Sequence, residues 1–315
     1  MSSSFKQKMK QALKNIIASP VREELEFVKR ENAMLREESE SLRQDLVRLQ
    51  GEFKEKNNEL IGLILKSRSF FIERGNERER PSAASLAPQR PVKDFESYAA
   101  LLEKEAPAAY REWRKLLEVN SKDYEGFPVE SCSVEGHGMA GYFQDFIAPY
   151  LRGRVLDIGC GPQPLPSYLE GYPLSNIAGI DPIPAATAHP FTFVRCFAEW
   201  LPWNEGSFET VINATSLDHV LLLERSLEEV RRVLCPGGHF LVWVGFVEGA
   251  AKYDPFDKAI VPVDRYHLFH FSRDWFEELM SRFFEVEESF HLERPSLSSF
   301  YSLVPLKEGA SHGNL

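Results

Sequence analysis

Residues 155–164 read V-L-D-I-G-C-G-P-Q-P, in which a short apolar run ends in an acid and two glycines follow. Gly159 and Gly161 would let the backbone turn sharply and approach a ligand without a Cβ in the way. A second apolar run, I-A-G-I-D, ends in Asp181, 24 residues after Asp157. A carboxylate at the end of such a strand can accept both hydroxyls of a ribose. The spacing therefore predicts a nucleoside site, although a tight turn at the glycines and a surface turn at Asp181 are the alternatives.

A second polar group, Asp218 and His219, follows a later apolar run. Imidazole titrates near neutral pH, so His219 is the candidate general base. Asp218 could orient it, contact the substrate or bind a metal; alternatively, both residues cap the helix that begins nearby. Two more histidines, His267 and His270, would point to opposite faces of a strand. For this reason no metal site is predicted.

The elements that must position these residues alternate between strand-like and helix-like runs from about residue 94 onward. Strands are predicted at 154–158, 177–181, 191–196, 209–214 and 238–246, and helices at 94–119, 138–151, 165–171, 223–234 and 273–282. This alternation predicts an α/β fold, a doubly wound and mainly parallel sheet. The last two strands, 284–292 and 298–304, are joined by a short proline-containing turn, so they must form a C-terminal antiparallel hairpin and complete a seven-stranded sheet.

Several segments, taken together and in this order, resemble the motifs of the class I, Rossmann-like S-adenosylmethionine-dependent methyltransferases. They are V-L-D-I-G-C-G, I-A-G-I-D, C-F-A-E-W-L-P-W at 196–203, S-F-E-T-V-I-N-A-T-S-L-D-H-V at 207–220 and R-R-V-L-C-P-G-G-H-F-L-V-W-V at 231–244. The resemblance implies S-adenosylmethionine as the cofactor. The cofactor-binding residues that it implies are Asp157, Gly159, Cys160, Gly161, Asp181, Pro182, Ala198, Glu199 and Ala214.

The resemblance also implies how the cofactor would be held. Asp157 would face the methionine amino end and Asp181 the ribose. Where the family has an acid that holds the adenine amino group, this chain has Phe197, so that contact is missing or comes from Glu199 or a backbone carbonyl, and Phe197 could stack near the ring. Segment 133–140 falls where such enzymes keep a mobile lid.

The activity that the resemblance implies is methyl transfer to an oxygen of a small-molecule or glycan acceptor, with His219 and Asp218 as the catalytic residues. The alternative is a non-catalytic scaffold with a degenerate domain, which the absent adenine acid favours and the intact glycines and acids oppose. A nicotinamide-dependent dehydrogenase is disfavoured, because Pro164 stands where the third glycine of G-x-G-x-x-G is required.

Residues 21–70 carry a heptad repeat. Its e positions from 22 to 43 are basic and its g positions from 24 to 59 are acidic. Glu24–Lys29, Glu31–Arg36 and Glu38–Arg43 are therefore complementary between identical parallel chains. Asn32 lies at an a position, where a buried amide favours two strands in register. We therefore expect a parallel homodimeric coiled coil, a rod about 75 Å long. The alternative is a single solvated helix with pairs within one chain, favoured by polar core positions at Ser39, Lys56 and Ser67.

The remaining segments flank this rod, which is assigned to 21–72. Residues 1–20 form a basic amphipathic segment that ends in a cap at Ser19, with Pro20 in the first turn of the next helix. Its residues 1–18 could touch an anionic membrane surface weakly, or remain a solvated tail. Residues 73–93 are charged and then rich in Pro, Ala and Ser, as in a linker. The methyltransferase-like domain is assigned to 94–310.

Composition narrows the class of protein. The 315 residues carry a net charge of −10, which disfavours a nucleic-acid partner. The sequence has neither an apolar run long enough for a bilayer nor a secretory signal. Its 4 cysteines lack the paired spacing of a zinc module or disulfide framework. We therefore expect a cytoplasmic protein, with the inner membrane surface as a peripheral location if residues 1–18 bind there.

Overall fold

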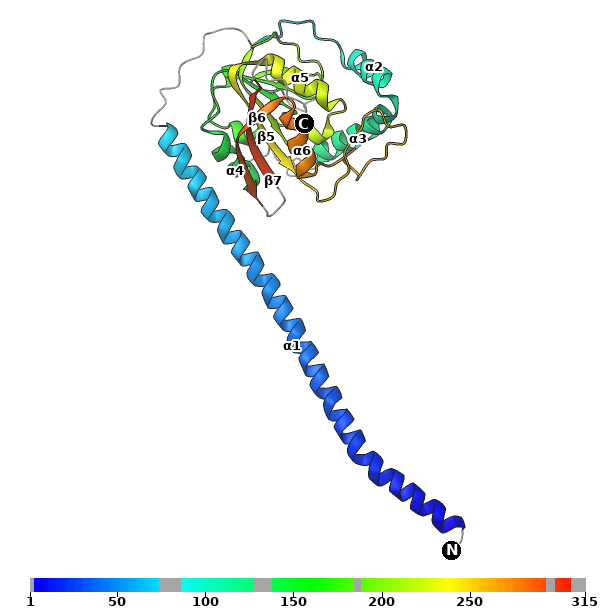
Figure 1. Ribbon diagram of the computed structural model, residues 1–315. Coiled ribbons are helices and arrows are strands. Elements are labelled where there is room, and N and C mark those ends of the chain that lie inside the picture. Colours follow the sequence, from blue (N-terminus) through cyan, green and yellow to red (C-terminus); the bar gives the residue numbers. More distant parts are fainter. Residues whose placement is uncertain (1–2, 74–85, 127–137, 184–187, 293–297, 307–315) are drawn as a thin grey trace, which may run out of the picture. The chain divides into compact units, whose positions relative to one another are not determined.

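The computed structural model describes residues 3–73, 86–126, 138–183, 188–292 and 298–306 (Figure 1). Contacts divide the chain into two compact units, Met1–Asn57 and Asn58–Leu315. Most of the predicted linker, 74–85, and most of the predicted lid segment, 133–137, lie outside the described residues.

The first element is a single helix, α1 (Ser3–Glu73). It runs through Pro20, so the helix break predicted at Ser19 and Pro20 is wrong. A proline removes one backbone hydrogen bond from a helix, while the turns on either side keep theirs. Near the start of this helix the side chain of Met9 is 55% exposed. Contact of residues 1–18 with a membrane stays a prediction. Within the described residues, no helix carries a stretch both apolar and long enough to cross a bilayer.

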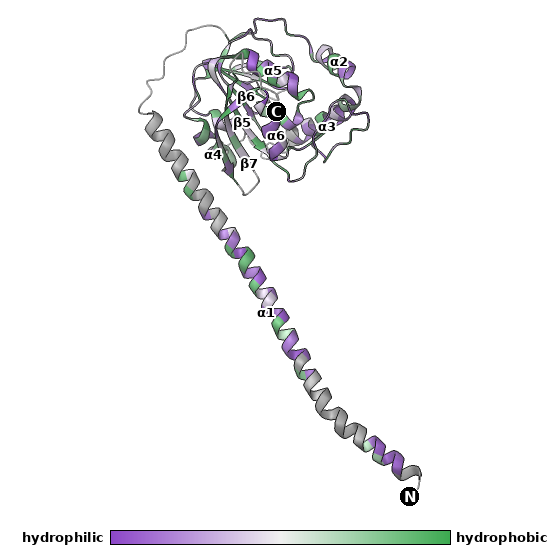
Figure 2. Ribbon diagram, in the orientation of Figure 1, coloured by the Kyte–Doolittle hydropathy of each residue, from purple (hydrophilic) through white to green (hydrophobic). Residues whose placement is uncertain are grey.

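The heptad leucines of α1 lie on its surface. Leu35, Leu42, Leu46 and Leu49 are each 54–64% exposed, and apolar residues recur between polar ones along the helix (Figure 2). Arg48 forms ion pairs within the same helix, such as the one with Asp45 at 3.0 Å, and exposed pairs of this kind contribute little stability. The single chain therefore leaves an apolar stripe uncovered.

The second unit contains one seven-stranded sheet with the order β3-β2-β1-β4-β5-β7-β6. Its strands are β1 (Val155–Ile158), β2 (Ile177–Ile180), β3 (Thr192–Val194), β4 (Phe208–Ala214), β5 (Leu234–Gly245), β6 (Phe284–Leu292) and β7 (Ser298–Pro305). The first five are parallel, and β7 pairs antiparallel with both β5 and β6. The predicted fold class and the C-terminal hairpin are confirmed.

The two faces of the sheet build two apolar clusters, as the alternation of side chains along β5 requires. Leu241 and Trp243 belong to the cluster that includes α4 (Gly138–Ile147). Phe240 and Val242 belong to the other, larger cluster. The helices that contribute to that larger cluster are α2 (Phe95–Glu105), α3 (Pro107–Gly126), α5 (Leu223–Val233) and α6 (Arg273–Ser281).

Two predicted helices differ from the structure at prolines. The helix predicted at 94–119 is two helices in the structure. The first ends with Ala106 as its C-cap, and Pro107 begins α3. The helix predicted at 165–171 is only a 3-10 turn, Ser167–Leu169. Pro166 precedes this turn, and Gly171 follows it with a φ of +79°; neither residue favours a regular helix.

The domain begins earlier than residue 94. The Trp203 indole N–H donates to the carbonyl of Leu86 at 2.9 Å. The backbone N–H groups of Gln89 and Arg90 both donate to the carbonyl of Pro202 at 3.0 Å. The part of the predicted linker from residue 86 onward is therefore packed against the sheet domain.

Candidate functional site

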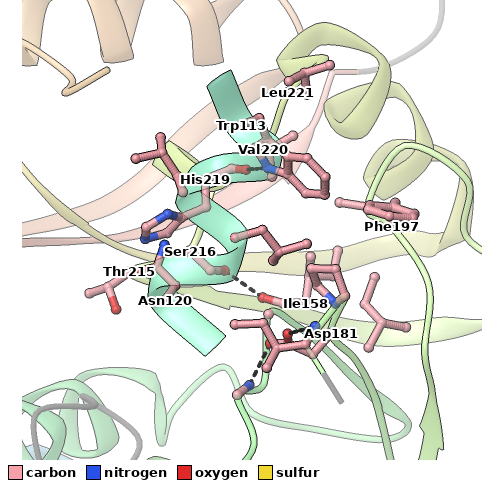
Figure 3. Close-up of a pocket in the computed structure, with 18 of the residues that line it drawn as sticks. Trp113, Asn120, Ile158, Asp181, Phe197, Thr215, Ser216, His219, Val220 and Leu221 are labelled. Carbon is pink, nitrogen blue, oxygen red and sulfur yellow. Dashed lines mark hydrogen bonds between the residues drawn. The ribbon is translucent and has the colours of Figure 1, made fainter. Parts of the chain in front are cut away.

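A pocket opens at the ends of β1, β2 and β4 (Figure 3). In the sheet order, β2 and β3 lie on one side of β1, and β4 and β5 lie on the other, so this is the topological switch point of the sheet. Ligands of open α/β sheets bind at such a point. The predicted site residues that line it are Gly159, Gly161, Asp181, Pro182, Ala198, Glu199, Ala214 and His219. The sequence thus identified residues from four separate segments that the fold brings together.

Gly159 forms part of the pocket wall directly after β1. It has a φ of +74°, and a Cβ built on it would lie 2.2 Å from the Oγ of Ser216. Ser216 Oγ in turn donates to the carbonyl of Ile158 at 2.9 Å. The position therefore admits only glycine, both for its backbone conformation and for the space available.

Asp181 fixes the glycine loop from the end of β2. Its Oδ2 accepts from the Gly161 N–H at 2.9 Å, and its Oδ1 accepts from the Ile183 N–H at 2.7 Å. A carboxylate has about four lone-pair positions, so both oxygens can accept one bond more from a ligand. Burial raises the pKa of Asp181 to about 6.

Asp157 lies under the same loop, fully buried and not itself on the pocket wall. Its Oδ2 accepts from the hydroxyl of Tyr168 at 2.9 Å, and Tyr168 lines the pocket. Its Oδ1 has no hydrogen-bond partner among the described residues. Burial raises the pKa of Asp157 to about 7. A buried carboxylate oxygen without a donor is costly, so this atom fits a ligand that brings a cationic N–H.

Phe197 and Glu199 also line the pocket. Phe197 packs its ring against Trp113, with centroids 5.5 Å apart, and both residues line the pocket. Glu199 Oε1 accepts from the N–H groups of Leu221 and Leu222. Part of this carboxylate therefore serves to hold the segment before α5, and the aromatic pair supplies an apolar part of the pocket wall.

Cys160 does not lie in the pocket lining, and its contact with the cofactor stays a prediction. Its side chain is buried and packs against Gly179 of β2, where a Cβ would come within 2.9 Å of its sulfur. Its backbone N–H donates to the carbonyl of Ile180 at 3.1 Å. Because the two glycines turn the chain, the residue between them points into the core rather than toward the ligand.

Several pocket residues were not predicted, and Trp113, Asn120 and Thr215 are three examples. Trp113 and Asn120 come from α3, whose sequence carries no signal for a site so far along the chain. Thr215 follows β4 with a φ of 54°, rare for a residue other than glycine. Backbone strain of this kind costs about 1–3 kcal/mol and is typical of ligand sites.

His219 stands at one side of the pocket, with Thr215 and Asn120 beside it (Figure 3). Its carbonyl accepts from the indole N–H of Trp113 at 2.8 Å. Asp218 does not line the pocket, and its Oδ1 lies 3.9 Å from His219 Nε2, too far for a hydrogen bond. Burial lowers the pKa of His219 to about 4, so its ring is neutral at neutral pH.

Residues 156–242 match the family described as a methyltransferase domain. The matched stretch runs from β1 into β5 and contains the glycine pair, Asp181 and His219. The match covers less than a third of the chain and lies entirely within the second unit. No curated protein matches the chain.

Solved structures with a similar fold include two methyltransferases. One is the 1,6-didemethyltoxoflavin-N1-methyltransferase of Burkholderia thailandensis with bound 1,6-didemethyltoxoflavin and S-adenosylhomocysteine. It is 16% identical over 70% of this chain and 95% of its own, with a TM-score of 0.49. The other is an S-adenosylmethionine-dependent methyltransferase from Mesorhizobium loti, 20% identical over 53% of this chain and 98% of its own, with a TM-score of 0.40.

Proposed function

We propose that this protein transfers a methyl group from S-adenosylmethionine to an oxygen of a small-molecule or glycan acceptor. The observation that carries the proposal is the unpartnered Oδ1 of Asp157 beneath a loop that only glycine can form, beside Asp181. Together they offer a place for an amino group at one end and for ribose hydroxyls at the other. The methyltransferase-domain match over 156–242 supports the same reaction class.

Each part of the pocket would hold one part of the cofactor. Asp157 would accept from the amino group, Asp181 from the ribose hydroxyls, and the rings of Phe197 and Trp113 would contact the adenine. S-adenosylmethionine would supply an electrophilic methyl on a sulfonium. The protein then has to place an acceptor oxygen in line with that methyl and remove its proton, and alignment supplies much of the acceleration.

Calorimetry followed by mass spectrometry tests this proposal. S-adenosylmethionine and S-adenosylhomocysteine should bind, whereas NAD and NADP should not. A screen of hydroxyl-bearing acceptors should then yield a product heavier by one methyl group. If the cofactor binds and no acceptor is methylated, the scaffold alternative gains; if neither cofactor form binds, the proposal is lost.

Ribose binding should weaken in acid. Burial raises the pKa of Asp181 to about 6, and only its ionised form accepts two hydroxyl donors fully. Affinity should therefore be constant above this pKa and fall by about tenfold per pH unit well below it. The ligand to titrate is 5′-methylthioadenosine, because it keeps the ribose and lacks the amino-acid part that faces Asp157. Asp181→Asn should bind this ligand weakly with a flat pH profile, and a wild-type profile that is flat from pH 5 to 8 would contradict the ribose role.

His219→Ala should keep cofactor affinity and lose turnover by about 10²–10⁴-fold, the usual contribution of a positioned base. His219 touches the acceptor side of the pocket, away from Asp157 and Asp181. The matched control is His291→Ala on β6, a partly buried histidine outside the pocket. Full turnover in His219→Ala would remove this residue from the mechanism.

We also propose that α1 pairs with α1 of a second copy as a parallel coiled coil. The exposed leucines at 35, 42, 46 and 49 support this, since a partner helix would cover them. The enzyme would then be a homodimer.

A further inference from the structure

A group of three histidines and two aspartates gathers beside the acceptor side of the pocket. The members of this histidine cluster are Asp218, His219, Asp264, His267 and His270. The first two lie in the 3-10 turn after β4, Leu217–His219, and the others in the loop before α6. This loop is not a strand, so the objection from the sequence, that His267 and His270 point apart, does not hold. Both rings reach one carboxylate.

Asp264 is the residue that orients the cluster. Its Oδ1 accepts from the backbone N–H groups of Tyr266 and His267, at 2.7 and 2.8 Å. Its carboxylate also lies 3.0 Å from Nδ1 of His267 and 3.0 Å from Nε2 of His270. A carboxylate accepts, so Nδ1 of His267 carries a proton, and in the neutral ring Nε2 then carries the lone pair.

That lone pair faces another acceptor. Nε2 of His267 lies 3.8 Å from Oδ2 of Asp218, and Nε2 of His219 lies 3.9 Å from Oδ1 of Asp218. Neither distance is a hydrogen bond. Oδ1 of Asp218 is buried and has no hydrogen-bond partner among the described residues. The rings of His219 and His267 lie close together, with centroids 4.6 Å apart and planes tilted by 31°. The Nε2 atoms of His219 and His267 and the carboxylate of Asp218 thus face one another, and no donor among the described residues hydrogen-bonds Oδ1 of Asp218.

We propose that Asp218, His219 and His267 bind a divalent transition-metal ion. Two imidazoles and one carboxylate form the protein ligand set of many zinc and non-haem iron sites, which keep positions open for substrate. Ligand atoms about 2.1 Å from a tetrahedral ion are about 3.4 Å apart. One ligand atom from each of the three residues already lies within 4.8 Å of the other two, so the side chains would have to close by at most about 1.4 Å. Asp264 then has the position of the outer carboxylate that fixes a ligating histidine.

The neighbouring combination of Asp264, His267 and His270 is a poorer site. Its nitrogen-to-oxygen distances are already 3.0 Å, as in hydrogen bonds, and each Asp264 oxygen is engaged. An ion there would have to displace these bonds. Ion binding at Asp218 displaces none.

The ion also bears on the acceptor. His219 lines the pocket, so the ion would lie at the side where an acceptor enters. This part rests on the proposed function: the acceptor would offer an oxygen ligand, a hydroxyl or an ionisable oxygen, to an open position. His219 would then be a metal ligand rather than a free base.

The test is a cobalt titration of the full-length, untagged, chelator-treated chain. Co²⁺ should bind at one equivalent and give visible d–d bands without the thiolate-to-cobalt band that cysteine ligands produce. Asp218→Asn and His267→Gln should each weaken binding by at least about 100-fold, and Asp264→Asn by about 10–100-fold. The control, His291→Gln, should bind as the wild type does. Circular dichroism checks that each variant is folded. Because two ligand variants are tested, the experiment still decides if one of them does not fold.

Cobalt that binds equally to wild type, Asp218→Asn and His267→Gln would overturn the proposal, as would the absence of one-equivalent binding in the wild type. Loss only in His270→Gln would move the ion to the poorer site and equally overturn it. Calorimetry with S-adenosylmethionine on the same samples separates the two proposals. Cobalt binding without cofactor binding keeps the metal site and removes the methyltransferase function, and the reverse result removes the metal site alone.

Discussion

Gly159→Ala should abolish cofactor binding within the measurable range, a loss of at least about 100-fold, and lower the free energy of unfolding by about 1–3 kcal/mol. Alanine at a φ of +74° is strained, and its Cβ would lie 2.2 Å from Ser216 Oγ. Relief of this contact requires Ser216 to leave Ile158 or the loop to lift toward the ligand. Calorimetry and thermal unfolding measure the two effects.

The control is Gly171→Ala, because it separates backbone strain from the loss of the pocket. Gly171 has a φ of +79°, and a Cβ there meets nothing within 4 Å. It should cost similar backbone strain but leave cofactor affinity unchanged. If Gly159→Ala binds the cofactor as well as Gly171→Ala does, the glycine loop is not the cofactor cradle and the proposed function fails.

Leu35→Glu combined with Leu42→Glu should convert a dimer to a monomer, with the dissociation constant raised by more than about 100-fold. Both leucines lie at d positions, and their side chains are 60% and 64% exposed in the single chain. Burial of a leucine stabilises by about 1.5–3 kcal/mol, and four carboxylates in the seam of a pair would repel one another. Sedimentation velocity on the full chain measures the change.

The matched control places charge on the same helix at outward f positions, as Arg30→Glu with Gln44→Glu, and should remain dimeric. Removal of residues 1–72 should give a monomer that binds the cofactor. A wild-type chain that sediments as a monomer at micromolar concentration would contradict the coiled coil. A dimer that survives removal of 1–72 would show that another surface assembles the protein.

The alternation of strands and helices was predictable, and so were the acids at the strand ends. Parallel strands that are buried on both faces are short apolar runs, and β1 and β2 are four residues each with every residue buried. The end of such a run locates Asp157 and Asp181 without knowledge of the tertiary fold. Pro107 was a signal for a helix boundary, but the apolar pattern continues on both sides of it. For this reason one helix was predicted instead of two.

The rest of the site depends on contacts between distant segments. The indole of Trp113 donates to the carbonyl of His219, which is 106 residues later in the sequence. The periodicity of apolar residues does not predict a contact between residues so far apart. The buried side chain of Cys160 was not predictable, because it depends on the conformation of the turn around it. His267 and His270 meet through Asp264, which required the loop conformation rather than a strand.

The connection from β1 to β2 contains two short 3-10 turns, Ser167–Leu169 and Leu174–Asn176, in place of a long helix, and this has an electrostatic consequence. Nucleotide-binding sheets usually place a long helix there, and its positive macrodipole end neutralises a pyrophosphate. Here the turn Ser167–Leu169 has three residues, too few to sum a useful dipole, and the nearby fixed groups are carboxylates. A diphosphate would meet repulsion without compensation, whereas a positively charged nucleoside would meet attraction. Because the prolines prevent this helix, the site favours ligands of positive charge over ligands of negative charge.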